Sequence, residues 1–160
     1  MRKVFLITGF NNWGKTTLLC DLFGKSSFHQ KVPQFFANCP FLVMPKSNDD
    51  LGRNVYEDAF NKRLKIFEEA NGKAKYIASA FCPTKEPSND SIDILHTLFK
   101  QDQVEILLLE YKWCGHAKLL ASEIKSFYAG EGNVTIHTVA SASSAAKLSQ
   151  AQSIFSSNLP

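Results

Sequence analysis

Two patterns of hydrophobic positions alternate along the chain. Short, continuously apolar runs predict strands that are covered on both faces. They lie at residues 4–7, 41–44, 76–81, 104–109 and 134–139. Stretches with apolar residues every three to four positions predict amphipathic helices. These stretches cover residues 15–23, 55–70, 91–100, 115–128 and 143–155.

Five strands that alternate with five helices indicate an α/β fold. We expect a three-layer arrangement, with a mostly parallel five-stranded sheet and helices on both faces. Residues 1–160 are expected to form a single domain, because 160 residues is an ordinary length for one domain. The pattern assigns inward positions on the helix at 55–70 to Tyr56, Ala59, Phe60, Phe67 and Ala70. On the helix at 115–128 it assigns them to Ala117, Leu120, Ile124, Phe127 and Tyr128.

Two of the connections between the expected strands and helices are longer than a simple turn. Residues 24–40 show no clear period, which indicates either a strand that the pattern does not reveal or a mobile connection. Residues 83–89 follow the third expected strand. Ligands bind at the carboxyl edge of open α/β sheets, so this second loop is well placed for function. The helix that follows it is expected to start with Asp90 or Ser91 as its N-cap.

Composition narrows the class of protein. Hydrophobic residues make up 44% of the chain and the net charge is +3, so neither disorder nor a nucleic-acid surface is indicated. The longest apolar runs are far shorter than a membrane span, and we expect no membrane contact and a cytoplasmic location. The four cysteines form no C-x-x-C pair, which argues against a zinc or disulfide framework. Cys114 and His116 alone are weak evidence for a metal site.

The clearest motif lies between the first strand and the first helix. Residues 9–16, Gly-Phe-Asn-Asn-Trp-Gly-Lys-Thr, match G-x-x-x-x-G-K-[ST] at every fixed position. Gly9 allows a tight exit from the strand, and Gly14 allows the backbone to approach a phosphate closely. The backbone amides and the helix N-terminus attract anions, while a lysine and a hydroxyl serve the terminal phosphates and magnesium. The expected nucleotide-binding residues are Asn11, Asn12, Trp13, Gly14, Lys15, Thr16 and Thr17.

On these residues the chain resembles the P-loop nucleoside triphosphatase and kinase superfamily. The firm resemblance covers about residues 4–24, and the α/β alternation of the remainder is a softer match. The resemblance implies that ATP or another nucleoside triphosphate binds with Mg²⁺. Lys15 is then expected to contact the β- and γ-phosphates and Thr16 to bind the magnesium, while the subfamily depends on a second site.

The second site requires an acidic residue at the carboxyl end of a strand. Glu110 directly follows the apolar run at 106–109 and has the form of a Walker B acid, which would bind magnesium together with Thr16. It is equally interpretable as a polar residue that ends a strand. Asp49 and Asp50 follow the second strand, where related small-molecule kinases use acids to bind magnesium or to act as a general base. Their alternative role is a turn and a helix cap.

Several other residues have two open interpretations. Arg53 either holds a phosphate or lies in solvent at a helix start. Trp13 either packs under the loop or stacks on a base or a partner. His116 and His137 have no evident orienting group, and each is interpreted as a structural or a surface residue. A GTPase is not favoured, since Thr84-Lys85-Glu86-Pro87 has proline where the guanine-binding motif needs an acid.

The sequence therefore favours an ATP-binding, magnesium-dependent ATPase with Lys15, Thr16 and Glu110 at its centre. A partner protein or self-association would supply an arginine, because the chain has only three. The alternative is a small-molecule or nucleotide kinase that uses Asp49, Asp50 or Arg53 on the acceptor. A GTPase and a module that binds nucleotide without hydrolysis are further alternatives. The position of the strand that ends in the Walker B acid would distinguish the two branches of the superfamily. It is adjacent to the strand at residues 4–7 in the kinase and GTPase branch and separated from it in the ATPases with an additional strand.

Overall fold

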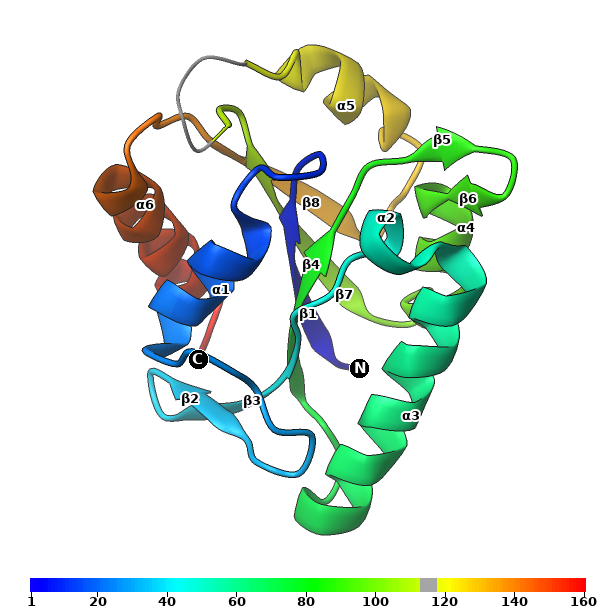
Figure 1. Ribbon diagram of the computed structural model, residues 1–160, viewed down its shortest axis with the longest axis vertical. Helices are drawn as coiled ribbons and strands as arrows, with labels where there is room; N and C mark the ends of the chain where they lie inside the picture. Colours follow the sequence, from blue (N-terminus) through cyan, green and yellow to red (C-terminus); the bar gives the residue numbers. More distant parts are fainter. Residues whose placement is uncertain (113–117) are drawn as a thin grey trace.

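The computed structural model describes residues 1–112 and 118–160. Its main feature is a six-stranded sheet (Figure 1). In chain order the strands are β1 (Lys3–Thr8), β2 (Gln34–Phe36), β3 (Cys39–Met44), β4 (Tyr76–Phe81), β7 (Gln103–Leu109) and β8 (Val134–Val139). They are arranged in the order β2-β3-β4-β1-β7-β8. The expected α/β architecture with a mostly parallel sheet is confirmed, although the sheet has six strands rather than five.

The sixth strand, β2, lies within the connection at 24–40. It pairs with β3 in antiparallel fashion, with Phe36 opposite Cys39. The pattern did not reveal it because it has only three residues at the edge of the sheet, where an alternating or continuous apolar run is not required. Of the two interpretations of this connection, a hidden strand is the one that the structure supports.

Strand β1 lies at the centre of the sheet, between β4 and β7. Val4 is in register with Ile77 on one side and with Val104 on the other, and all three strands are parallel. The carboxyl ends of β1, β4 and β7 therefore meet at one edge of the sheet. The segments that follow them, which begin at residues 9, 82 and 110, emerge there together.

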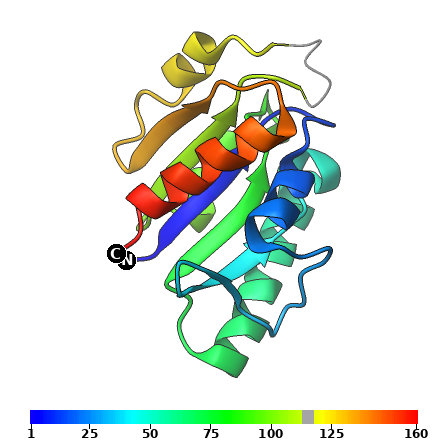
Figure 2. The ribbon, with the colours of Figure 1, turned by 90° about the vertical axis from the view of Figure 1, so that its left-hand side faces the viewer.

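Helices cover both faces of the sheet, as the sequence predicts. Helices α1 (Lys15–Phe23) and α6 (Ser144–Ser157) pack on one face, and α3 (Arg53–Asn71) and α4 (Ser91–Leu98) pack on the other (Figures 1 and 2). A short helix, α2 (Asn48–Leu51), follows β3 and was not anticipated as a separate element. None of the described helices is long and apolar enough to cross a membrane.

The helix expected at 115–128 is shorter than predicted. Helix α5 spans Ala121–Phe127. Three of the expected inward positions are correct, because Ile124 and Phe127 pack against the core and Tyr128, just after the helix, is buried. Residues 113–117 lie outside the described part of the chain, and the expected inward position of Ala117 with them. Leu120, also expected inward, is 60% exposed, whereas Leu119 is buried. The reason is local, because the Leu119 amide donates to the Glu110 carbonyl and holds residues 118–120 out of the helix.

On α3 the expected inward face is mostly correct. Tyr56, Phe60 and Phe67 are buried, and Ala59 packs against the core. Ala70 is exposed, contrary to the prediction. It lies in the last turn of α3, which ends at Asn71 and projects past the sheet (Figure 1).

The loop at 83–89 contains a small hairpin. Strands β5 (Lys85–Glu86) and β6 (Asn89–Asp90) pair in antiparallel fashion and form a separate two-stranded sheet. Asp90 caps α4, since its side chain accepts a hydrogen bond from the Ile92 amide at 2.8 Å. The hairpin thus links the carboxyl end of β4 to the start of α4.

Candidate functional site

The Gly9–Thr16 loop connects the central strand β1 to α1, and its backbone requires unusual conformations. Gly14 and Asn12 have φ angles of 82° and 59°, in the left-handed region that favours these residue types. A Cβ atom on Gly9 would lie 3.2 Å from the Cβ of Trp13. Gly14 is the N-cap of α1 and supplies no side-chain hydrogen bond to the amides of the first turn. Those amides keep their capacity to bind an anion.

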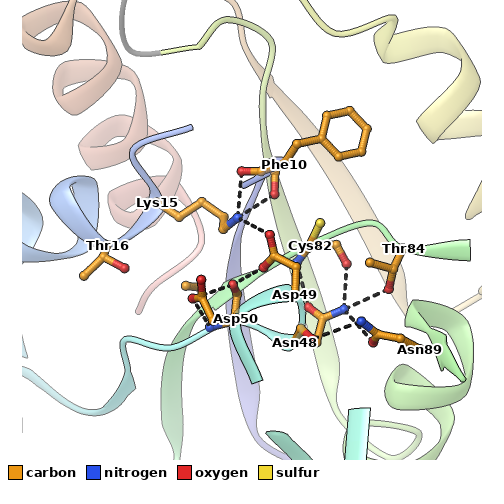
Figure 3. A network of polar contacts seen from close by, with 12 residues as sticks. Phe10, Lys15, Thr16, Asn48, Asp49, Asp50, Cys82, Thr84 and Asn89 are labelled. Carbon is orange, nitrogen blue, oxygen red and sulfur yellow. Dashed lines mark hydrogen bonds and ion pairs between the residues drawn. The ribbon is translucent and has the colours of Figure 1, made fainter. Parts of the chain in front are cut away.

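Lys15 lies at the centre of the site and is only 6% exposed. Its ammonium group donates hydrogen bonds to the carbonyl oxygens of Gly9 and Phe10, both at 2.8 Å. It also lies 3.5 Å from Oδ2 of Asp49 (Figure 3). The loop thus folds back on its own lysine, and the charge is held at the carboxyl end of β1.

Asp49 and Asp50 lie on α2, immediately after β3. The Asp50 carboxylate accepts hydrogen bonds from the amide and hydroxyl of Ser47, at 3.1 and 2.9 Å, in a capping box. The Ser47 hydroxyl also contacts Asp49. The two interpretations of this acidic pair are therefore compatible, because Asp50 caps α2 while Asp49 faces Lys15.

A cleft of about 700 Å³ opens beside the loop. Its lining includes residues 11–18 of the loop and of α1, and Asp50 from α2. Lys112, Ser144 and Lys147 complete the opposite side. The Lys147 ammonium donates to the Tyr111 carbonyl at 2.7 Å, which ties the start of α6 to the segment after β7. The cleft therefore combines three lysines with at least one carboxylate, a charge pattern suited to a polyanion accompanied by a cation.

Thr16 faces the same edge of the sheet as the acidic pair. Its hydroxyl donates to the carbonyl of Pro45 at 2.9 Å, just before α2. Among the described residues no group of three or more histidines, cysteines or acids is placed to hold a metal. The donor set still fits magnesium, which takes one or two carboxylates, a hydroxyl and water and completes its shell with phosphate oxygens.

Glu110 lies at the carboxyl end of β7, as expected, but its carboxylate pairs with Lys118 and not with Lys15. Its Oε1 is 3.4 Å from the ammonium of Lys118. Neither Glu110 nor Asp49 is among the described residues that line the cleft, whereas Asp50 is. The structure thus brings Asp49, rather than Glu110, to Lys15.

Arg53 lies at the start of α3 and is held by two acids. Its guanidinium donates to Glu57 at 2.9 Å and to Asp93 at 2.6 Å. These hydrogen bonds raise the pKa of Arg53, with Glu57 as the main cause. The contacts favour the structural interpretation of Arg53 over a phosphate-binding role.

Trp13 and His137 also have structural contacts. Trp13 is 8% exposed and its ring packs edge-on against Phe10 with ring centroids 5.8 Å apart, as expected for packing at the loop. His137 lies 2.8 Å from the carboxylate of Glu105, which is buried between β1 and β8. His116 and Cys114 lie outside the described residues.

Sequence reasoning missed a buried polar cluster beside the acidic pair. It is made by Asn48, Cys82, Thr84 and Asn89, which we call the asparagine cluster (Figure 3). Burial, with a smaller contribution from the charge of Asp49, raises the pKa of the Cys82 thiol to about 12, so the thiol stays protonated at neutral pH. No periodicity or motif marks these residues, because their contacts join segments that are 34 to 41 residues apart.

The comparisons with known proteins do not extend this picture. No protein-family model matches the chain, and the searches of curated proteins and of solved structures likewise find no match.

Proposed function

We propose that the chain binds a nucleoside triphosphate with Mg²⁺ at the Gly9–Thr16 loop and cleaves its γ-phosphate, as a protein of the P-loop type. One observation carries the proposal. Lys15 lines a cleft of about 700 Å³, and its ammonium lies between the loop carbonyls and Asp49 at the carboxyl end of the central parallel strand. Parallel α/β sheets bind ligands at this edge.

Different residues of the chain bind the phosphates and the magnesium. The uncapped amides at the start of α1 bind phosphate oxygens, and the helix dipole strengthens this attraction. Lys15 exchanges its loop carbonyls and Asp49 for the β- and γ-phosphates. The Thr16 hydroxyl, released from Pro45, would hold Mg²⁺, which offsets the charge that develops on the phosphates.

Asp49 and Asp50 are the acids that this geometry favours for magnesium and its water ligands. Both lie on α2, and Asp49 already contacts Lys15. Glu110 would have to release Lys118 and reach the cleft from β7 to play the same role. The Walker B assignment of Glu110 remains a hypothesis that a substitution can test against the two aspartates.

A kinase is the second candidate, and two observations favour it. Strands β4 and β7 both lie directly beside β1, and no additional strand separates either of them from β1. This order supports the kinase and GTPase branch rather than the ATPases with an additional strand. In addition, the acids at the cleft follow β3, where a kinase needs a general base for the acceptor hydroxyl.

All three arginines of the chain are engaged in contacts within the protein. Fast turnover would therefore require an arginine from a partner. Arg2 is paired with Asp102, and Arg53 with Glu57 and Asp93. Arg63 donates to the carbonyl of Phe28. An arginine that stabilises the transition state would therefore come from a partner protein or from a second copy of the chain.

Binding is tested with a panel of nucleotides, measured as thermal shift and by titration calorimetry with and without magnesium. We expect a triphosphate to raise the Tm of the wild type. Lys15→Ala should weaken its affinity about 10- to 100-fold, because a charge-assisted hydrogen bond is lost. Lys65→Ala, which removes an exposed lysine of α3, is the matched control and should bind as the wild type does. Binding of no triphosphate by the wild type would refute the proposal.

Turnover separates the two candidates. Release of phosphate without an acceptor, lost in Asp49→Asn or Asp50→Asn, would support a hydrolase that uses the α2 acids. Transfer that appears only when a hydroxyl-bearing acceptor is added would support the kinase. Loss of turnover in Glu110→Gln, with both aspartate variants active, would restore Glu110 as the magnesium-binding acid.

A further inference from the structure

Asn48 makes an unusually complete set of hydrogen bonds for a residue next to the acidic pair. Its side chain is fully buried. The Nδ2 group donates to the Cys82 carbonyl at 3.1 Å, to the Thr84 hydroxyl at 2.9 Å and to Oδ1 of Asn89 at 3.3 Å. Its Oδ1 accepts from the Cys82 amide at 2.8 Å. Asn89 donates in turn to the Asn48 carbonyl at 3.0 Å.

The order of the strands explains why such an anchor is needed. The acidic pair follows β3, the loop with Lys15 follows β1, and β4 lies between these two strands. Neighbouring strands are about 4.8 Å apart, so Asp49 must extend across the carboxyl end of β4 to reach Lys15. Cys82 is the first residue after β4, and its backbone carbonyl and amide are both hydrogen-bonded to the Asn48 side chain.

The same anchor joins the β5–β6 hairpin to the site. Thr84 precedes β5 and Asn89 begins β6, and both bind the Asn48 side chain (Figure 3). The hairpin therefore supports α2 from behind, on the side away from the Gly9–Thr16 loop. Because a buried amide that loses its partners is costly, α2 has one favoured position against β4.

We propose that Asn48 is a positioning residue, which holds the α2 acids against Lys15 and the cleft by anchoring them to the end of β4 and to the β5–β6 hairpin. The inference deepens the proposed function and rests on it for the role of the acids. Asn48 touches neither Lys15 nor the cleft, so it acts only through Asp49 and Asp50. Groups that orient metal-binding side chains commonly change metal affinity by about 10- to 100-fold when they are removed.

The first test measures how much magnesium tightens triphosphate binding. This factor is the ratio of the calorimetric affinities of one triphosphate, ATP, with and without Mg²⁺. Asn48→Ala should reduce the factor about tenfold and leave metal-free binding nearly unchanged. Asn133→Ala is the matched control, because Asn133 also donates its amide to two carbonyls, those of Phe99 and Asp102, remote from the cleft. A reduction no larger in Asn48→Ala than in Asn133→Ala would overturn the proposal.

A variant that already lacks both α2 acids distinguishes a positioning role of Asn48 from a general loss of structure. In a chain that carries Asp49→Asn and Asp50→Asn, Asn48→Ala should reduce the magnesium factor no further, because the residues through which it acts are gone. An equal reduction in this background would overturn the proposal. Asn89→Ala, which removes one link of the cluster, replaces Asn48→Ala in both measurements if the latter does not fold.

A third measurement needs no nucleotide and so distinguishes failure of this inference from failure of the proposed function. A double-mutant cycle on Tm, with Lys15→Ala and Asp49→Asn, reports the coupling of this ion pair. The coupling should be present in the otherwise unchanged protein and lost when Asn89→Ala or Asn48→Ala is added. Persistence of the coupling would overturn the positioning role, even if the wild type bound no triphosphate.

Discussion

At the scale of single residues, the ion pair between Lys15 and Asp49 is the contact that bears most directly on the proposed function. The side chains of Lys15 and Asp49 are 6% and 15% exposed, and their charged atoms are 3.5 Å apart. Such a partly buried pair is screened little by salt. If the proposed function holds, a triphosphate would displace Asp49 from Lys15, while magnesium would need the same carboxylate.

This double role predicts effects of opposite sign for Asp49→Asn. Affinity for ATP without magnesium should rise several-fold, because a competing anion is removed from Lys15. The tightening by magnesium should fall by about tenfold, because a carboxylate of the expected metal shell is lost. Titration calorimetry with ATP in EDTA and in excess magnesium measures both.

The control is Asp58→Asn, an exposed position on α3 that changes the net charge equally. It should leave both affinities unchanged. If Asp49→Asn weakened binding with and without magnesium by the same factor, the competition between Asp49 and phosphate would be disproved.

The residues of the site differ in how predictable they were. Lys15 and Thr16 belong to a contiguous motif whose spacing has a direct physical meaning. Asn48 and Cys82 belong to no motif, and their roles depend on contacts across 34 residues. Among the acids the sequence favoured Glu110 over Asp49, but in the structure Asp49 lies beside Lys15 and Glu110 lies beside Lys118. Both acids follow apolar strands, so the sequence pattern could not show which one approaches the lysine.

At the scale of elements, strands and long helices were predictable, and short or peripheral elements were not. The five apolar runs that became β1, β3, β4, β7 and β8 lie within one or two residues of the strand bounds. Strand β2 and the β5–β6 hairpin have two or three residues each, too few for a period. Helix α5 is shorter than its pattern predicted, although Ile124 and Phe127 pack against the core as expected.

The start of α4 yields a prediction for an element. The sequence left Asp90 and Ser91 as possible N-caps, and the structure assigns the cap to Asp90. Ser91 is buried, and its hydroxyl is hydrogen-bonded to the Thr84 carbonyl and the Tyr128 hydroxyl. Asp90→Ala should lower the free energy of unfolding by about 1 kcal/mol, since the Ile92 amide loses its acceptor. Urea denaturation measures the change.

Asp58→Ala serves as the comparison, because Asp58 is exposed within α3 and caps no helix. It should alter the free energy of unfolding by less than about 0.5 kcal/mol. Equal stability of Asp90→Ala and the wild type would show that the cap contributes nothing to α4.

At the scale of the whole molecule, one aromatic cluster joins both ends of the chain. Phe155 of α6 stacks on Phe5 of β1 with centroids 4.2 Å apart. It also contacts Phe41 of β3 and Phe36 of β2 at 5.7 and 5.4 Å. The last helix therefore completes the core that the first strand begins.

Truncation of this ring should destabilise the entire domain. Phe155→Ala is expected to cost about 3–5 kcal/mol, because it removes a fully buried ring and leaves a cavity. The midpoint of guanidinium unfolding should fall in one cooperative transition. Phe35→Ala is the control, since Phe35 is 62% exposed on β2 and should be nearly neutral. A cost below about 1 kcal/mol for Phe155→Ala would contradict the assigned packing.

The amino-acid sequence by itself determined the α/β alternation and the Gly9–Thr16 loop with its lysine. Both depend on neighbouring residues, namely on hydrophobic period, glycine conformations and the junction of a strand with a helix. Only the tertiary structure decided the order of the strands, the choice of Asp49 over Glu110 as the partner of Lys15, and the hydrogen bonds of Asn48 to the end of β4 and to the β5–β6 hairpin. These features arise where the ends of β1, β3 and β4 meet, and such meetings depend on packing between segments distant in the chain.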